Sequence, residues 1–418
     1  MKFWKYGRVA LALIGSIILG LNITCCGIYT SGYLFATGVQ FNQVAAYKID
    51  HDFGYLTPVT GSPFPANGFD PVQELVVPGG RFLAVVNKGQ AGVAGSGGVS
   101  IFTIGGAGVL YFQGTYSTAG SSPVSIAMDA SSRYMYVTDQ IAPDGSGRGD
   151  ITVFQFDSNT GKLTLITNAN TFNTNGKQLS YFEVNYKPVQ VVVAAGYVYV
   201  LDQGYPTGTT GVPGISPSQQ YIPDVFLYQI NETSGQLVLT QNQPLQTGSK
   251  PGALSTMAVS GGGKYLYLAD TAANEILPFT IGSGGTLQTL VGGPVPNYST
   301  SVNPDAILPS ANTNFLYVAN FGPGSVQAQQ SNITAYTVDQ SNGQLQQIPG
   351  NPYPSGPGPI WMVEDPTNQY IYEANFYDNT INGYIIDAST GQLSPLFKGT
   401  SFATVGQPTF IAVSSRVY

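Results

Sequence analysis

Cysteine, histidine and charge are scarce in this sequence. The 418 residues include two cysteines, both close to the N-terminus, and one histidine, and only 9% of the residues are charged. Without further cysteines, the rest of the chain has no disulfide and no cysteine nucleophile. The single histidine, His51, falls in a turn sequence where we expect it to be solvated. A Ser-His-Asp triad and a His-rich zinc site are therefore excluded.

Acidic residues outnumber basic ones, and the formal net charge is −7. Proteins that bind nucleic acids need a basic surface, so this balance excludes nucleic acid as a partner. We also expect no cofactor and no bound metal.

The first residues have the pattern of an export signal. Three basic residues precede the mostly apolar stretch Val9–Ile23, which is short for a membrane span. The sequence TCCG follows and resembles the lipobox of bacterial lipoproteins, with Cys26, or alternatively Cys25, as the lipidated residue. We therefore predict a signal over 1–26, a linker over 27–32, and a protein of the cell envelope that touches the membrane only through a lipid anchor. An ordinary secretory signal and an uncleaved anchor are the alternatives.

Three short motifs each occur seven times in the remaining chain. A β-rich motif such as YLYLAD begins at Tyr33, Phe82, Tyr134, Tyr197, Tyr265, Phe315 and Tyr370. A glycine-containing turn follows each copy and begins at Asp50, Gly105, Asp157, Asn231, Gly282, Asp339 and Asp387. A proline introduces the first strand of each repeat, at Pro71, Pro123, Pro188, Pro251, Pro304, Pro359 and Pro408. The three markers agree on seven repeats.

One repeat, residues 251–287, has the pattern of most of a four-stranded antiparallel sheet, with short β-rich runs divided by Gly, Asn and Asp clusters. Tandem sheets of this kind are typical of a β-propeller, in which each blade covers the faces of its neighbours. We predict an all-β, seven-bladed propeller of four-stranded antiparallel blades over 33–418. The repeats begin at a second strand and end after a first strand. The C-terminal inner strand should therefore join the N-terminal blade and close the ring.

Long insertions are concentrated in the loops between second and third strands, which share one face of a propeller. They are Lys88–Gly98, Gln140–Gly149, Gln203–Pro223 and Phe321–Ser331. Variable loops on a rigid scaffold often carry function, so we expect ligand binding on this face and at the channel mouth, with Tyr205 and Tyr221 taking part. The alternative is that these loops are disordered decorations.

Six second strands end in Asn or Asp on the same face: Asn87, Asp139, Asp202, Asp270, Asn320 and Asn375. Six oxygen-bearing side chains would suit calcium. A feature present in nearly every blade is better explained by hydrogen bonds to turn backbone, and we predict that structural role.

Departures from the repeat supply the remaining candidates. Lys187 and Lys250 each precede the proline of an inner strand in adjacent blades, where they could hold an anion or be solvated. Trp361 lies near the start of the last full blade's inner strand, as a stacking platform near the channel or as a packing residue.

Two glutamates fall in otherwise apolar columns. Glu74 lies where other inner strands carry Ile, Val, Leu or Met, and Glu373 lies where other second strands carry Val or Leu. A carboxylate there must be paired, protonated or near water, which makes both glutamates candidate catalytic groups. A one-residue bulge that turns each of them outward is the alternative.

Motifs such as YLYLAD, FLYVAN and YMYVTD, with DxxTGxL-type turns, resemble the YVTN-type repeats of the bacterial lactonase or 6-phosphogluconolactonase-like seven-bladed family. The resemblance spans the chain after residue 32 and implies the opening of 6-phosphogluconolactone or a related cyclic ester. Lactonase-type members carry histidine and arginine near the channel. The corresponding runs here are NPDAI at Asn303 and GPIWM at Gly358, so no catalytic residue is carried over.

Three functions remain, and the sequence leaves open whether the protein is an enzyme. We favour an exported, monomeric propeller that binds a neutral carbohydrate, a peptide or an envelope protein through the insertion-rich face. The second is a lactone hydrolase for an unphosphorylated substrate, with Glu74 or Glu373 activating water. The third is a structural role in the cell envelope.

Overall fold

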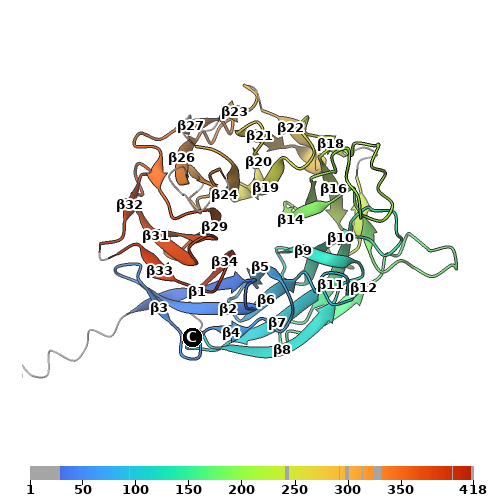
Figure 1. Ribbon diagram of the computed structural model, residues 1–418, viewed down its shortest axis with the longest axis horizontal. Helices are drawn as coiled ribbons and strands as arrows, with labels where there is room; N and C mark the ends of the chain where they lie inside the picture. Colours follow the sequence, from blue (N-terminus) through green and yellow to red (C-terminus); the bar gives the residue numbers. More distant parts are fainter. Residues whose placement is uncertain are drawn as a thin grey trace, which may run out of the picture.

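The computed structural model describes residues 29–415, with gaps at 94, 241–243, 291, 297–300, 313, 324–330 and 398. The described chain forms seven antiparallel sheets that follow one another around a central axis (Figure 1). This arrangement confirms the predicted seven-bladed propeller. The predicted signal and both cysteines lie outside the described residues, among which no helix is long and apolar enough to cross a membrane.

The four main strands of each blade are counted outward from the channel, beginning with blade one at the N-terminus. The inner strands of blades one to seven are β34 (Pro408–Ser415), β5 (Pro71–Val76), β9 (Ser121–Met128), β14 (Pro188–Ala194), β19 (Leu254–Val259), β24 (Pro304–Pro309) and β29 (Pro359–Glu364). The second strands are β1 (Thr30–Gly38), β6 (Phe82–Asn87), β10 (Tyr134–Ile141), β15 (Tyr197–Asp202), β20 (Tyr265–Asp270), β25 (Phe315–Asn320) and β30 (Tyr370–Asn375).

The third strands are β2 (Gln43–Asp50), β7 (Gly98–Ile104), β11 (Asp150–Phe156), β16 (Asp224–Ile230), β21 (Glu275–Ile281), β26 (Asn332–Val338) and β31 (Thr380–Ile386). The outer strands are β3 (Leu56–Pro58), β8 (Leu110–Ser117), β12 (Leu163–Ile166), β17 (Leu237–Leu239), β22 (Leu287–Thr289), β27 (Leu345–Gln347) and β32 (Leu393–Pro395).

Every blade except blade two has a fifth, very short strand that pairs with its third strand, a feature that the sequence motifs did not predict. These strands are β4 (Phe64–Pro65), β13 (Phe182–Glu183), β18 (Leu245–Gln246), β23 (Val295–Pro296), β28 (Tyr353–Pro354) and β33 (Ser401–Ala403). Two short 3-10 turns, η1 (Gly261–Gly263) and η2 (Ser283–Gly285), lie in blade five.

The ring closes as predicted. β34 pairs antiparallel with β1, from Gly32 opposite Ser415 to Gly38 opposite Pro408. The first and last described strands thus share one sheet (Figure 1).

One predicted marker is displaced. In blade six, Pro304 begins the inner strand and pairs with Asn320, the last residue of the second strand. In blade five this position belongs to Leu254, which pairs with Asp270. The prediction that Pro251 introduces this strand is therefore wrong by three residues, and Lys250 is not equivalent to Lys187.

Neighbouring blades are joined by a contact between an aromatic ring and a glycine. The first aromatic residue of each second strand lies over the glycine in the turn between the third and outer strands of the next blade. A Cβ atom added to Gly285 would lie 2.6 Å from the Tyr197 ring, and one added to Gly343 would lie 2.5 Å from the Tyr265 ring. The same contact joins Tyr33 to Gly108, Phe82 to Gly161, Tyr134 to Gly235, Phe315 to Gly391 and Tyr370 to Gly54.

The second tyrosine of several Tyr-x-Tyr motifs adds a hydrogen bond to the same turn. The hydroxyl of Tyr199 donates to the carbonyl of Gly285 at 2.8 Å, and that of Tyr372 donates to the carbonyl of Gly54 at 2.7 Å. Tyr199 and Tyr372 are both fully buried. A buried carbonyl left without a donor would be costly, so the hydroxyl secures the turn that the ring covers.

We predict that Gly285→Ala destabilises the protein much more than Gly284→Ala. Both glycines have left-handed backbone, with φ of 74° and 73°, which costs alanine about 1–2 kcal/mol. Only Gly285 lies under a ring, and the overlap adds about 1–3 kcal/mol. Urea unfolding of the two variants measures the difference. Equal losses would show that the ring contact contributes nothing.

Candidate active site

The wall of the central channel is shaped by a β-bulge repeated in every blade. Each inner strand changes register against its second strand at the same place, just after its proline, or after Leu254 in blade five. Bulges re-aim side chains, and here they turn one residue of each blade towards the axis. These residues are Val72, Val124, Val189, Ser255, Asp305, Ile360 and Thr409, and all of them line one cavity of about 160 Å³.

Asp305 is the ionisable side chain in this cavity, which is otherwise lined by apolar, hydroxyl and amide side chains. Its carboxylate is partly exposed to the channel although protein surrounds it. In the described part of the chain it has no hydrogen bond or ion pair. Removal from bulk water raises the pKa of Asp305 to about 7. The group can therefore exchange a proton near neutral pH.

An aromatic pair lies on the same wall. The rings of Trp361 and Phe410 are stacked, with centroids 4.1 Å apart and an interplanar angle of 28°. Both line the channel cavity, in the two blades that follow Asp305 around the ring. Trp361 packs on apolar residues, as one of the two predicted alternatives has it, and it also lines the cavity.

Polar side chains on the other half of the channel are already engaged. Gln73 accepts a hydrogen bond from the backbone N–H of Ile126 at 2.7 Å, and Ser125 accepts one from Val191 at 3.0 Å. Gln190 accepts in the same way from the next blade. These bonds satisfy backbone N–H groups of the inner strands, which are edge strands of their sheets. The channel side chains that are not occupied by such bonds are therefore Asp305, Trp361 and Phe410.

The sequence profile of the family described as "Lactonase, 7-bladed beta-propeller" matches residues 32–177 and 224–413, most of the chain. The chain belongs to the seven-bladed lactonase propeller family. The unmatched residues 178–223 contain the long insertion of blade four.

Individual relatives of this lactonase-family propeller are distant. It is 26% identical to a 6-phosphogluconolactonase of Yersinia pestis over 140 residues, which cover 33% of this chain and only 38% of the relative. It is 23% identical to a 6-phosphogluconolactonase of Formosa agariphila over 327 residues, 76% of this chain and 82% of the relative. The periplasmic gluconolactonase of Pseudomonas aeruginosa has a TM-score of 0.67 and 17% identity, covering 92% and 99% of the two chains. That likeness shows the fold alone.

The sequence pattern alone does not single out Asp305, although the run NPDAI contains it. The residue after the inner-strand proline varies among blades as Val, Ile, Thr or Asp. Only the bulge shows that this column faces the channel. Comparing that single column across the blades would have singled out Asp305.

Glu74 does not line the channel. It follows the bulge of β5, yet it stays in the buried column between blades and is only 1% exposed. The predicted alternative of an outward turn is therefore wrong. Neither carboxylate oxygen has a hydrogen bond of good geometry, although the backbone of Ala412 lies close. Burial raises the pKa of Glu74 well above its usual range, so it is a neutral interior group without access to water.

Glu373 is also fully buried, but it holds a connection in place. Its Oε1 accepts a hydrogen bond from the Gly356 N–H at 2.8 Å and lies 2.7 Å from the Tyr384 hydroxyl oxygen. The Tyr384 hydroxyl lies 2.9 Å from the Pro354 carbonyl as well, and its single hydrogen cannot serve both. If Glu373 is protonated, its O–H donates to the Tyr384 oxygen, and the Tyr384 hydrogen is left for the Pro354 carbonyl. Burial raises its pKa to about 7. The geometry thus supports a structural role for both predicted glutamates.

Lys187 and Lys250 do not occupy equivalent positions in their blades, contrary to the prediction. Lys187 is half-buried beside the channel entrance, and its pKa is lowered by burial and by Lys88 of blade two. Lys250 is exposed and lines a different cavity, in blade five. The like-charged neighbour of Lys187 is therefore Lys88.

Tyr205 and Tyr221 are packing residues of the blade-four insertion. They are 8% and 6% exposed, and they form an antiparallel bridge. The Tyr221 ring lies 4.2 Å from that of Tyr186. The insertions of blades three and four also touch, because a Cβ on Gly214 would overlap the backbone of Ser146. The two insertions thus pack on each other, and the two tyrosines offer little surface to a ligand.

Of the Asn and Asp residues that end the second strands, Asp270 makes the predicted bonds to turn backbone, whereas Asn320 bonds to a side chain. Asn320 donates to Asn332 at 2.9 Å, and Asp270 accepts from two turn N–H groups. In blades three and four the residue at this position instead meets a second buried aspartate across the strands, pairing Asp139 with Asp150 and Asp202 with Asp224. Burial raises the pKa of all four carboxyl groups, so each pair retains protons in the folded state.

We predict that the free energy of unfolding falls as pH rises from 5 to 8. The buried carboxyl groups have higher pKa values folded than unfolded, so the folded chain binds more protons and rising pH removes stability. Each proton lost costs about 1.4 kcal/mol per pH unit within its titration range. Urea titrations at both pH values measure the slope, and Asp150→Asn should reduce it. Stability that rises with pH would contradict the protonated pairs.

Proposed function

We propose that this propeller hydrolyses a lactone in its central channel, with Asp305 activating the attacking water. The observation that carries the proposal is a single unpaired carboxylate on the channel wall with a pKa of about 7. A general base acts best when its pKa lies near the working pH. Family membership, and the lactones named in relatives called 6-phosphogluconolactonase and gluconolactonase, support the reaction class.

The chemistry follows from the position of the carboxylate. Ionised Asp305 takes a proton from water as the water oxygen bonds to the lactone carbonyl carbon. The tetrahedral intermediate then collapses, the ring C–O bond breaks, and the proton passes from Asp305 to the leaving alkoxide. The product is an open-chain hydroxy acid, and Asp305 returns to its ionised form.

The cavity lining favours a neutral, hydroxyl-rich substrate. The stacked rings of Trp361 and Phe410 offer an aromatic surface for the C–H face of a sugar ring. Ser255 donates to the backbone carbonyl of Pro304 at 2.8 Å, which leaves its oxygen free to accept from a substrate hydroxyl. The residues lining the cavity include no Lys, Arg or His, and Asp305 would repel a phosphate.

Binding of a carbohydrate, peptide or protein on the insertion-rich face becomes the less favoured function. Its two named tyrosines are buried, whereas the channel supplies an unpaired carboxylate. Export and lipid attachment remain proposals supported by the basic and apolar N-terminal pattern. A periplasmic location is named for the Pseudomonas aeruginosa gluconolactonase, in keeping with export.

We predict that Asp305→Asn lowers kcat for D-glucono-1,5-lactone by about 10²–10⁴, because a missing general base costs that much. The full-length protein is assayed by acid release, with spontaneous hydrolysis subtracted. Asp157→Asn, in an exposed turn of blade three, is the matched control and should keep full activity. Glu74→Gln and Glu373→Gln should also stay active. Loss of activity in either of these two, with Asp305→Asn unaffected, would return the chemistry to the buried glutamates.

We predict that kcat/KM rises with pH and levels off above about 7. The active form of Asp305 is the carboxylate, and its raised pKa means that the group is largely protonated below pH 6. Activity should fall about tenfold per pH unit on the acid side. Initial rates between pH 5 and 8 measure the profile. A flat profile across this range would exclude Asp305 as the base.

A further inference from the structure

The end of the second strand and the start of the third strand form a corner in each blade. In six of the seven blades a residue from the segment before the inner strand covers this corner. The residue concerned lies three positions before the inner-strand proline, whose place Leu254 takes in blade five, and in the six blades it packs on this corner or bonds to it. Asn185 donates to Asp224 at 2.7 Å, Ser301 donates to Asn332 at 2.7 Å, and the Gly356 N–H donates to Glu373. Gly68, Gly120 and Val405 lie against the same corner in blades two, three and one.

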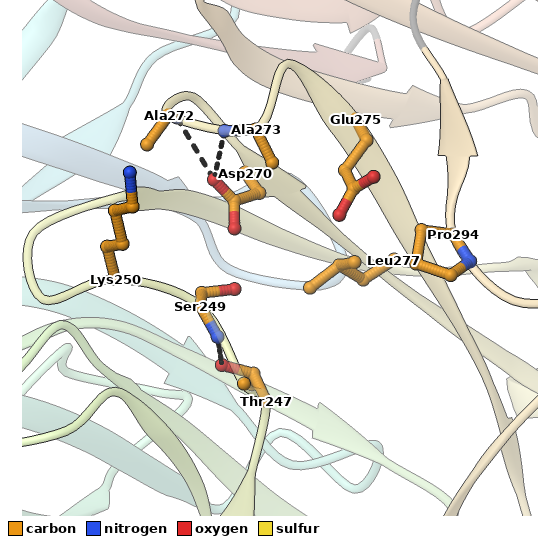
Figure 2. Close-up of a pocket in the computed structure, with 10 residues that line it drawn as sticks. Thr247, Ser249, Lys250, Asp270, Ala272, Ala273, Glu275, Leu277 and Pro294 are labelled. Carbon is orange, nitrogen blue, oxygen red and sulfur yellow. Dashed lines mark hydrogen bonds between the residues drawn. The ribbon is translucent and has the colours of Figure 1, made fainter.

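Blade five breaks this pattern because the position is Pro251, which has neither an N–H nor a polar side chain. The residue that ends the second strand of blade five, Asp270, is 3% exposed. The Oδ1 atom of Asp270 accepts from the N–H groups of Ala272 and Ala273, at 3.0 and 2.9 Å. The other oxygen points away from that turn into open space between Ser249 and Glu275 (Figure 2). A carboxylate this deeply buried is left with one oxygen facing a cavity.

This cavity has a volume of about 280 Å³ and lies on the insertion-rich face. The loop between second and third strands is only four residues long in blade five, whereas the neighbouring blades four and six carry long insertions at the same place. Thr247, Ser249 and Lys250 form one side of the cavity, and Asp270, Glu275 and Leu277 form the other (Figure 2).

The two carboxylates of the cavity lack a positive partner. Asp270 and Glu275 are opposite each other across β20 and β21. Burial and the neighbouring Asp270 raise the pKa of Glu275. In the described part of the chain neither carboxylate forms an ion pair, and Lys250, at the rim, remains more than 4 Å from both. An added cation would relieve this repulsion.

We propose that this cavity binds a small ligand through a primary ammonium group. An ammonium group has three N–H donors, and three acceptors face the space: the free oxygen of Asp270, the carboxylate of Glu275 and the hydroxyl of Ser249. Calcium fits less well, since it needs six to eight oxygen ligands. The exposed Lys250 stands where it could meet a ligand carboxylate. An amino sugar and a free amino acid share the recognised group.

The proposal is tested by calorimetric titration of the full-length protein with D-glucosamine and with glycine, against D-glucose and calcium chloride. Binding of either amine with a Kd below ~10 mM, and no binding of glucose, is expected. Tighter binding of glycine would assign Lys250 to the ligand carboxylate, and tighter binding of glucosamine would assign a sugar. Equal binding of glucose, calcium binding alone, or no amine binding would overturn the proposal.

Two matched variants locate the binding. Asp270→Asn keeps an oxygen for both turn N–H groups, and the fold already carries asparagine at this position as Asn87, Asn320 and Asn375. It should weaken amine binding at least tenfold, as should Glu275→Gln. Glu232→Gln, exposed on the opposite face, should leave binding unchanged. Lactonase activity depends on Asp305 and should survive in all three, which also reports correct folding. Unaltered amine binding in Asp270→Asn would place the ligand elsewhere.

Discussion

The ring of this propeller depends on one contact, an aromatic side chain lying over a glycine of the next blade. It occurs between every pair of neighbours, including blade seven and blade one, where Tyr370 covers Gly54. The glycine is needed twice over, because the turn has left-handed backbone and because no Cβ fits beneath the ring. Together with the pairing of β34 on β1, this contact makes the blades a rigid circle whose loops and channel residues are free to vary.

The functional features arise where this repetition is broken. All seven inner strands share a bulge, so the backbone presents seven equivalent positions to the channel. Blades two, three and four use neighbouring polar side chains to satisfy backbone N–H groups. Blades six, seven and one instead present Asp305, Trp361 and Phe410 to the cavity. In blade five a displaced proline opens a second cavity. The repeated blade provides the scaffold, and single residues that depart from the repeat provide the candidate catalytic and binding groups.

Scarcity of basic residues governs the electrostatics of the interior. In the described part of the chain the ion pair found is between His51 and Asp52, at the surface. Buried carboxyl groups such as Glu74, Glu373 and Asp150 are not matched with lysine or arginine. They are kept neutral by protons, since burial raises their pKa values. The same effect, acting on a carboxylate that lines the channel cavity, raises the pKa of Asp305 to about 7, which suits the proposed role as a general base.

The sequence by itself determined the number of blades, the strand order and the closure of the ring, because the two halves of the aromatic–glycine contact are local motifs that repeat along the chain. It also placed Trp361 near the channel. It did not distinguish Glu74, which is buried between blades, from Asp305, which faces the axis. A β-bulge shifts the facing of a strand by one residue, and hydrophobic alternation does not reveal where that shift occurs. The offset of Pro251 from Leu254, and the burial of Tyr205 and Tyr221, likewise depend on pairing and packing with segments distant in sequence, which only the tertiary structure decided.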